Sequence, residues 1–154
     1  MIVVSDTSCI TNLIAIGRIQ LLADLFGTVL IPVAVRGELT VSPARLPTFI
    51  WVQAAVDRAA VGRLLDEDLD EGEAEAIVLA EETRASALLI DEAAGRKTAQ
   101  RLGLRIIGLL GVLRRAKKRG FIPAVRPDLD ALQLLGFRGA PALRARVVKD
   151  LGET

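Results

Sequence analysis

The chain has 154 residues, of which 51% are hydrophobic, 25% are charged and only 3% are aromatic, and its net charge is +1. This composition excludes a disordered chain and is typical of one globular domain large enough to bury a core. The net charge excludes nucleic-acid binding driven by bulk charge, and a single cysteine, Cys9, excludes an internal disulfide and a thiolate zinc site.

The first forty residues predict strands that alternate with helices. The apolar runs are short and contain no regular polar alternation, as in strands that are covered on both faces. Pro32 stands at the first turn of a helical segment, where proline is tolerated. In chain order the predicted elements are a strand at 2–5, helices at 8–17 and 18–26, a strand at 28–31 and a helix at 32–39.

The following segments continue this alternation. Two prolines indicate a loop at 40–48, and residues 49–52 predict a short edge strand. The next elements are helices at 56–66 and 71–83, a strand at 87–90, a helix at 92–102, a strand at 104–107 and a helix at 109–119. From Arg126 onward, the Leu and Ala spacing predicts two more helices, separated between Gly136 and Pro141. The β-α-β order predicts an α/β domain with right-handed crossovers.

Four acids stand where these elements would bring them together. Asp6 and Asp91 directly follow predicted strands, and sites in open parallel sheets form outside the carboxyl ends of the strands. Glu38 and Glu73 lie in helical segments that could close around the first two. Because the chain contains no His and no Tyr, carboxylates are almost its only catalytic groups.

Each acid also has a purely structural interpretation. Asp6 and Asp91 could cap the helices that follow them, Asp70 and Glu73 form a capping-box pattern, and Glu38 could be a solvated residue on an exposed helix face. As a group, however, four neighbouring carboxylates would repel one another. A cluster of hard oxygen ligands is instead what Mg²⁺ or Mn²⁺ requires, and such a cation supports phosphodiester chemistry.

Five segments carry a combination of motifs in a fixed order. They are Val3–Ser8, Leu30–Leu39, Gly72–Ala80, Leu88–Glu92 followed by Arg96 and Ala99, and Ile107–Leu113. Together they resemble the PIN-domain (PilT N-terminus) ribonucleases, particularly the VapC-like toxins of prokaryotic toxin–antitoxin pairs. The resemblance covers roughly residues 1–120, and the tail with Gly136-Phe137-Arg138 is similar to that of one uncharacterised subgroup.

The resemblance implies a three-layer α/β/α fold with a central, mainly parallel sheet. Residues 1–154 would form a single PIN-like domain, with the acidic site in a core at 1–125 and a C-terminal helical extension at 126–154. The implied activity is cleavage of RNA by an endoribonuclease that uses Mg²⁺ or Mn²⁺. The implied catalytic and metal-binding residues are Asp6, Glu38, Glu73 and Asp91. Thr7 or Ser8 could hydrogen-bond a metal ligand or a phosphate, although Ser8 could equally cap a helix. Arg96 and Lys97 are close enough to Asp91 in the sequence to contact substrate.

The third acid departs from the family pattern. Glu73 stands where many relatives have Asp, and Glu75 is an alternative. Two residues apart on a helix, these side chains point about 200° apart, so only one can easily face the site. The neighbours Ile77 and Ala80 favour Glu73, whereas Glu75 lies nearer Leu79.

Two more positions depart from the pattern. Cys9 stands where a proline is common, and the fourth acid is followed by Glu92 and then Ala93-Ala94, where many relatives have a further Asp. The number of metal ions, one or two, therefore stays open. Ser8 also argues against a haloacid-dehalogenase-like phosphatase, which needs a second Asp two residues after the first.

Basic residues offer a possible contact with substrate. The densest run lies within residues 114–119, where five cations could neutralise RNA phosphates or form a solvated helix end. One Trp and four Phe provide no evident platform for stacking bases. The expected partners are RNA, an antitoxin protein and a second copy of the chain, in the cytoplasm and without a membrane. The alternatives are a non-catalytic PIN-like scaffold for RNA or protein and a housekeeping RNA-processing nuclease.

Overall fold

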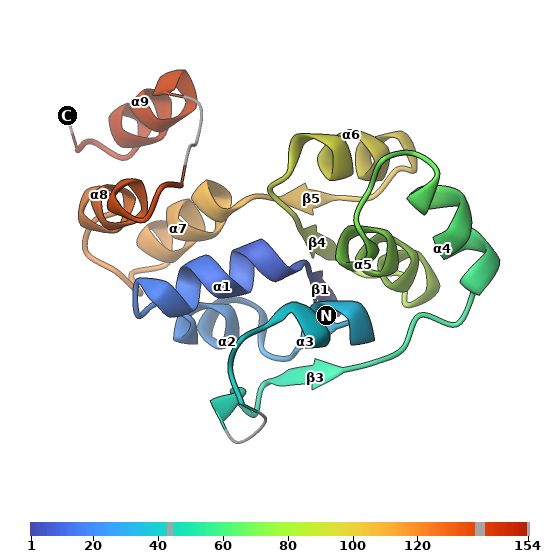
Figure 1. The fold of residues 1–154 in the computed structure, drawn as a ribbon. Coiled ribbons are helices and arrows are strands. Elements are labelled where there is room, and N and C mark those ends of the chain that lie inside the picture. The colour runs from blue at the N-terminus through green and yellow to red at the C-terminus, as the bar shows by residue number, and fades with distance from the viewer. Residues whose placement is uncertain (43–44, 138–140, 154) are drawn as a thin grey trace.

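A computed structural model describes residues 1–42, 45–137 and 141–153. Its centre is a five-stranded sheet in the order β3-β2-β1-β4-β5, in which every neighbouring pair is parallel (Figure 1). The strands are β1 (Val3–Ser5), β2 (Val29–Ile31), β3 (Ile50–Val52), β4 (Ala87–Leu89) and β5 (Ile106–Ile107). Helices cover both faces of this sheet, which confirms the predicted three-layer α/β/α fold.

The order in which strands are added to the sheet reverses at the central strand β1. From β1 the chain adds β2 and then β3 on one side, and it returns to add β4 and β5 on the other side. Val4 of β1 accordingly aligns with Leu30 of β2 and with Leu88 of β4. Binding sites in open α/β sheets form at such a reversal, outside the carboxyl ends of the strands.

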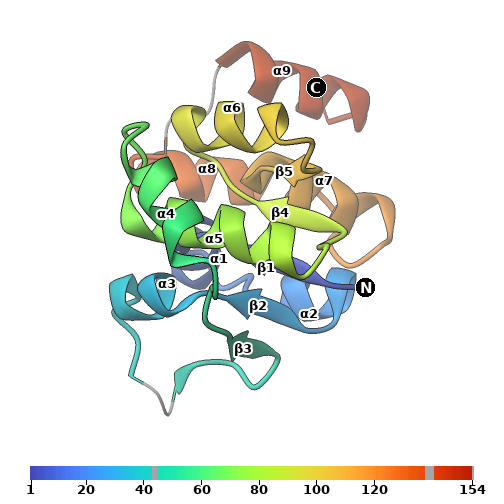
Figure 2. The ribbon, with the colours of Figure 1, turned by 90° about the vertical axis from the view of Figure 1, so that its right-hand side faces the viewer.

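Alternate strand residues enter two separate hydrophobic cores. Val3 belongs to the core beneath α1 (Thr7–Ala15), α2 (Gln20–Phe26) and α7 (Leu109–Lys118), together with Val35 of α3 (Val33–Glu38). Val4 belongs to the core beneath α4 (Arg58–Leu65), α5 (Glu71–Glu82) and α6 (Ala93–Arg101). Figure 2 shows α4, α5 and α6 on the side of the sheet that faces the viewer. The strands are apolar without interruption because their alternate side chains pack into the two cores on opposite faces of the sheet.

The C-terminal helices α8 (Arg126–Leu134) and α9 (Pro141–Asp150) pack onto the first of these cores through Leu129, Leu132 and Val147. The Glu153 carboxylate accepts hydrogen bonds from Lys117 Nζ (2.7 Å) and from the backbone N–H groups that begin α8. Burial acts to raise the pKa of Glu153, but these hydrogen bonds outweigh it and lower that pKa.

Every predicted strand and helix is present, with its ends shifted by no more than two residues. Residues 43–44 of the predicted loop and 138–140 of the predicted break between the last two helices lie outside the described residues. Among the helices in the described ranges, none is long and apolar enough to cross a membrane.

Replacing Glu153 with Gln should loosen the attachment of α8 to α7. The loss of a charged acceptor for Lys117 and two N–H groups should lower the free energy of unfolding by about 1–3 kcal/mol. Chemical denaturation would measure this change. Glu67→Gln is the control, since the one ion pair of Glu67 among the described residues is an exposed contact with Arg101, whose removal should cost at most about 1 kcal/mol. Equal losses in the two variants would contradict the anchoring role of Glu153.

Candidate functional site

Asp6 is buried at the end of the central strand. Its backbone N–H extends the sheet by donating to the Leu89 carbonyl (2.9 Å), and its side chain is the N-cap of α1, accepting from the Cys9 N–H (3.1 Å). Only 2% of the residue is exposed. The predicted capping role is therefore confirmed, and it places the carboxylate at the reversal point of the sheet.

Asp91 follows the neighbouring strand and lies beside Asp6. The Asp91 N–H donates to Asp6 Oδ2 (3.4 Å), and Asp91 Oδ1 accepts from the N–H of Leu109, the first residue of α7 (2.8 Å). The expectation that Asp91 caps the helix at 92–102 is wrong, because Glu92 occupies the N-cap position of α6 and makes no capping bond. Since β4 and β5 are neighbours, their carboxyl ends bring Asp91 to the start of α7 instead.

Burial makes Asp6 a weak acid in this environment. Burial is the largest effect and, with the negative charge of Asp91, raises the pKa of Asp6 to about 7. Hydrogen bonds from the Cys9 and Asp91 N–H groups and from the Ser8 hydroxyl (3.3 Å) oppose the rise. Asp6 thus changes charge near neutral pH in the protein without a bound cation.

Cys9 connects the two aspartates. Its backbone N–H caps Asp6, and its buried thiol donates to Asp91 Oδ2 (3.3 Å). Burial, followed by the charges of Asp6 and Asp91, raises the pKa of the Cys9 thiol well above its ordinary value, so the sulfur keeps its proton. The proline that is common here in the family could supply neither hydrogen bond, because it has no N–H and no thiol.

Glu38 reaches the same region from the end of α3. Its Oε2 accepts a hydrogen bond from Thr7 Oγ1 (2.5 Å). The carboxylate lies against α5 so closely that a Cβ atom added at Gly72 would stand 2.8 Å from Glu38 Oε1. A glycine at this position therefore lets the acid of α3 approach the helix that carries Glu73.

Glu73 has one carboxylate oxygen engaged and one without a partner. The predicted capping box is confirmed: the Glu73 N–H donates to Asp70 Oδ1 (2.7 Å), and the Asp70 N–H donates to Glu73 Oε1 (3.1 Å). Glu73 Oε2 is buried and has no hydrogen-bond partner among the described residues. Burial raises the pKa of Glu73, the Asp70 N–H opposes this, and the charges of Asp70 and Glu92 add to the rise.

Glu75 plays a different part from Glu73. Its Oε1 accepts from the Ala34 N–H (3.0 Å), and its Oε2 pairs with Arg58 (3.1 Å), so that it links α5 to α3 and α4. Burial alone does not distinguish the two acids, because all residues from Gly72 to Ala80 are buried. The partners of the two acids distinguish them instead.

The acids converge on two adjoining hollows. An acidic cavity of about 380 Å³ contains no Lys or Arg in its described lining, and its acids are Asp6, Glu38, Asp70, Glu73 and Glu92. Thr7 and Ser8 also line it. The fourth expected acid, Asp91, lies in a neighbouring groove of about 1060 Å³ together with Arg96 and Lys97, and Glu92 lines both hollows. The structure thus brings the expected residues to one region, divided between a cavity and a groove.

Asp70 and Glu92 are acids of this region that the sequence did not indicate as site residues. The signal for Asp70 was present in the capping box, which fixes it three residues before Glu73. The signal for Glu92 was its position directly after Asp91. A helix start explained the Asp70 pattern, and Glu92 stood out only as a departure from the family pattern, so only the tertiary structure shows that both residues line the acidic cavity.

The carboxylate side chains of the site are suitable ligands for a divalent cation, but in the described residues they do not converge on a single metal position. Carboxylate oxygens suit Mg²⁺ and Mn²⁺. Glu73 Oε2 lacks, within the described ranges, the hydrogen bond that a buried polar atom normally has. In the described ranges, however, no three His, Cys, Asp or Glu side chains are close enough to hold a metal ion. Cation binding would therefore require side chains such as the exposed Glu38 to rotate.

A family model described as a PIN domain matches residues 2–153, which is nearly the whole chain, and confirms the PIN-domain part of the resemblance. No curated protein and no solved structure matches the chain. PIN domains are typically nucleases. The acidic region lies outside the carboxyl ends of the central strands, where open α/β sheets generally form their binding sites.

The ionisation of Asp6 should make stability depend on pH when divalent cations are removed. Because its folded pKa (about 7) exceeds its ordinary value of 3.8, the protonated form stabilises the fold, and this contribution is lost as pH rises through that interval. The expected loss is about 1.4 kcal/mol per pH unit. Denaturation in EDTA would measure it, with Asp6→Asn as the comparison. A wild-type protein with the same pH dependence as the variant would contradict the raised pKa.

Gly95 of α6 should be required for the position of Glu73. An alanine Cβ there would stand 2.7 Å from Glu73 Oε2 and 2.6 Å from Ile90 Cδ1, so Gly95→Ala should destabilise the protein by about 1–3 kcal/mol. The control is Gly62→Ala in α4, where nothing lies within 4 Å of the added atom. This change should stabilise the helix by about 0.5–1 kcal/mol. A stabilising Gly95→Ala in thermal unfolding would show that the close approach to Glu73 is unimportant.

Proposed function

The chain belongs to the PIN-domain family, and we propose that it is a Mg²⁺- or Mn²⁺-dependent endoribonuclease that acts as the toxin of a VapC-like toxin–antitoxin pair. The observation that carries the nuclease proposal is the boundary at Asp91 and Glu92. On one side lies a cavity lined by five acids, and on the other a groove that contains four Arg or Lys side chains. A site for a cation beside a site for an anion is what metal-assisted cleavage of a phosphodiester requires.

The four family acids would hold the cation. Asp6, Glu38 and Glu73 contribute oxygens from the acidic cavity, and Asp91 contributes from its border with the groove. A bound Mg²⁺ or Mn²⁺ supplies positive charge at the scissile phosphate and lowers the pKa of water. No side chain of the chain is needed as a covalent nucleophile.

The neighbouring residues orient these acids. Thr7 holds Glu38, Ser8 holds Asp6, and the Cys9 thiol holds Asp91 through the hydrogen bonds described above. Such partners of ligand side chains fix their direction, and their loss typically costs about 10- to 100-fold in metal affinity or activity.

Arg96 is the basic side chain best placed to meet a phosphate at the acids. Its Nη1 donates to the Ile90 carbonyl (3.0 Å), directly before Asp91. A Cβ atom at Gly108 would stand 2.7 Å from Arg96 Nη1 and 2.9 Å from Asp91 Oδ1, so the guanidinium and the carboxylate share one small space. A cation here can stabilise negative charge that develops on the substrate.

The toxin part of the proposal rests on the sequence resemblance. It includes an antitoxin protein that blocks the site, a homodimeric assembly and a cytoplasmic location. Expression of the chain alone should then arrest growth, and coexpression of a protein encoded next to it should restore growth. Cleavage without growth arrest would favour the housekeeping nuclease instead.

One observation favours a second candidate, a PIN-like scaffold that binds RNA or protein without cutting. In the described part of the chain, the acids do not form a ready three-ligand cluster. Titration with Mn²⁺ separates the two candidates, because a scaffold has no reason to bind the ion at these acids. Binding that disappears in Glu73→Gln would support the nuclease.

Asp6→Asn should abolish metal-dependent RNA cleavage while the protein stays folded. The amide oxygen can still accept the Cys9 N–H, but the negative charge is lost, and activity should fall by at least about 100-fold. Incubation of a structured-RNA pool with Mn²⁺, Mg²⁺ or EDTA would measure cleavage. Asp24→Asn, an exposed change on α2, is the control. Cleavage that survives unchanged in Asp6→Asn would refute the assignment.

A further inference from the structure

Helix α9 is attached to the rest of the protein by few buried side chains. Of its ten residues, Pro141–Asp150, only Val147 is buried, and it belongs to the core beneath α1, α2 and α7. Val148 and Leu151, which directly follows the helix, are partly buried against the same core. A helix with so little buried apolar surface separates from its neighbours at a smaller cost in free energy than unfolding of the whole domain.

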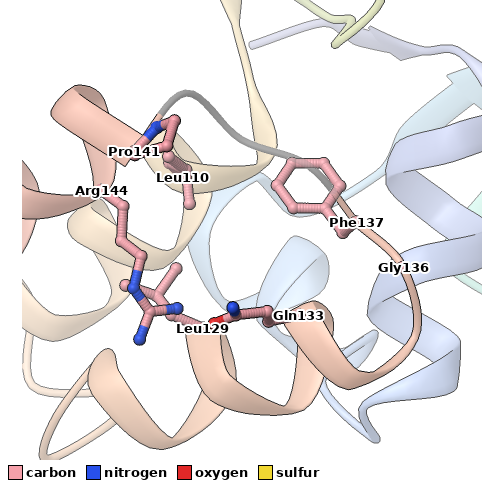
Figure 3. A pocket seen from close by; sticks show the side chains of 7 residues that line it. All are labelled: Leu110, Leu129, Gln133, Gly136, Phe137, Pro141 and Arg144. Atoms are coloured by element: carbon pink, nitrogen blue, oxygen red, sulfur yellow. The ribbon is translucent and has the colours of Figure 1, made fainter.

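A cavity lies beneath this helix. Figure 3 shows the pocket, of about 550 Å³, which Pro141 and Arg144 of α9 line together with Leu110 of α7 and Leu129 of α8. Side chains that face a cavity make fewer contacts than side chains in a close-packed core. Among the described residues, the packing of α9 against α7 and α8 is therefore incomplete.

Polar contacts provide much of the remaining attachment. The Lys117 ammonium group of α7 donates to the Glu153 carboxylate (2.7 Å) and to the Leu151 carbonyl (2.6 Å), both of which follow α9 directly. We call these contacts of Lys117 the latch. Within α9 itself, Arg144 forms an ion pair with Asp130 of α8. The docked position of α9 thus depends largely on a few charged groups.

The position of α9 affects the candidate site because this helix also lines the groove beside Asp91. Leu143 and Val147 of α9 contribute to the lining of that groove, which includes Asp91 and Arg96. Leu110 lines both the groove and the pocket beneath α9, so the two hollows adjoin. Separation of α9 would remove its side chains from both hollows and widen the approach to Asp91.

We propose that α9 is a detachable cover of the groove beside Asp91, and that the latch sets the fraction of molecules in which the cover is open. The inference deepens the proposed nuclease function and rests on it for one consequence, the access of substrate to Asp91 and Arg96. The apparent affinity of a substrate that requires the open state is reduced in proportion to the open fraction. The opening itself is a property of the fold and is measurable without substrate.

The rate at which iodoacetamide reacts with engineered thiols tests whether α9 opens. Val147→Cys and Leu110→Cys place thiols at positions 6% and 7% exposed, and Val61→Cys, 1% exposed in the core beneath α4 and α5, reports unfolding of the whole domain. The first two thiols should react at least about tenfold faster than the third. Their rates should also rise less steeply with urea, because local opening exposes less surface than unfolding. The wild-type protein, with its buried Cys9, gives the background rate.

A second change tests the latch. Lys117→Met removes both donated hydrogen bonds and should accelerate the reaction of Val147→Cys and Leu110→Cys by about 10- to 100-fold, as expected for the loss of hydrogen bonds between charged groups. Lys118→Met is the matched control, since it removes the same charge from an exposed neighbour that lines neither hollow. It should leave both rates unchanged.

Three results would overturn the inference. The first is an equal rate and an equal urea dependence at all three thiols, which would mean that only unfolding of the domain exposes them. The second is an equal effect of Lys117→Met and Lys118→Met. The third is a Leu110→Cys rate that does not respond to Lys117→Met, because α9 would then not cover this residue.

Cleavage assays test the consequence for access and keep the two proposals apart. At RNA concentrations far below saturation, Lys117→Met should have a higher kcat/KM than Lys118→Met, by no more than the factor measured in labelling. Equal kcat/KM values together with faster labelling would overturn the role of α9 in access, even though the protein is a nuclease. Absence of cleavage by the wild-type protein would refute the proposed function alone, because the labelling rates decide whether α9 opens over the groove.

Discussion

The burial of two carboxylates at the reversal point of the sheet is the constraint on which the rest of the site depends. Asp6 and Asp91 end adjacent parallel strands, so the backbone itself forces them together. Placing like charges in a buried position is costly, and the raised pKa of Asp6 expresses that cost. The N–H groups of Cys9, Asp91 and Leu109 reduce it by donating hydrogen bonds. Two of these donors lie at helix starts, where N–H groups have no partner within the helix.

Helix α5 positions the remaining acids of the site. Its central residues are buried, and it carries two glutamates with separate tasks. Glu75 is engaged by Ala34 and Arg58 and joins α5 to α3 and α4, whereas one oxygen of Glu73 has no hydrogen-bond partner among the residues that the structure describes. The same helix accepts Glu38 against Gly72, because the absence of a Cβ leaves room for the carboxylate. Structural and candidate catalytic acids thus stand two residues apart, and their surroundings assign them different roles.

Local sequence patterns predicted most of the helices and strands and some of the site residues. Apolar runs located the strands, and the Asp70–Glu73 spacing located the start of α5, because both patterns reflect interactions between residues close in the chain. The wrong expectation for Asp91 shows the limit of such reasoning. Its carboxylate caps a helix that begins eighteen residues later, through a hydrogen bond made possible by the pairing of β4 with β5. The cations at 114–119 likewise form one run in the sequence, yet Lys117 turns to Glu153 while Arg115 lines the groove.

The sequence by itself determined the α/β class, the order of the elements and the identity of the acids at the strand ends. These features follow from periodicity, from strand-end positions and from motifs that match a PIN-domain family model. Only the tertiary structure decided which acids share a cavity, that Glu92 borders both hollows, and that apolar side chains of α9 line the same groove as the basic side chains of α6 and α7. The physical reason is that these relations depend on strand order and helix packing, which join residues far apart in the chain, whereas periodicity reports only on neighbours along it.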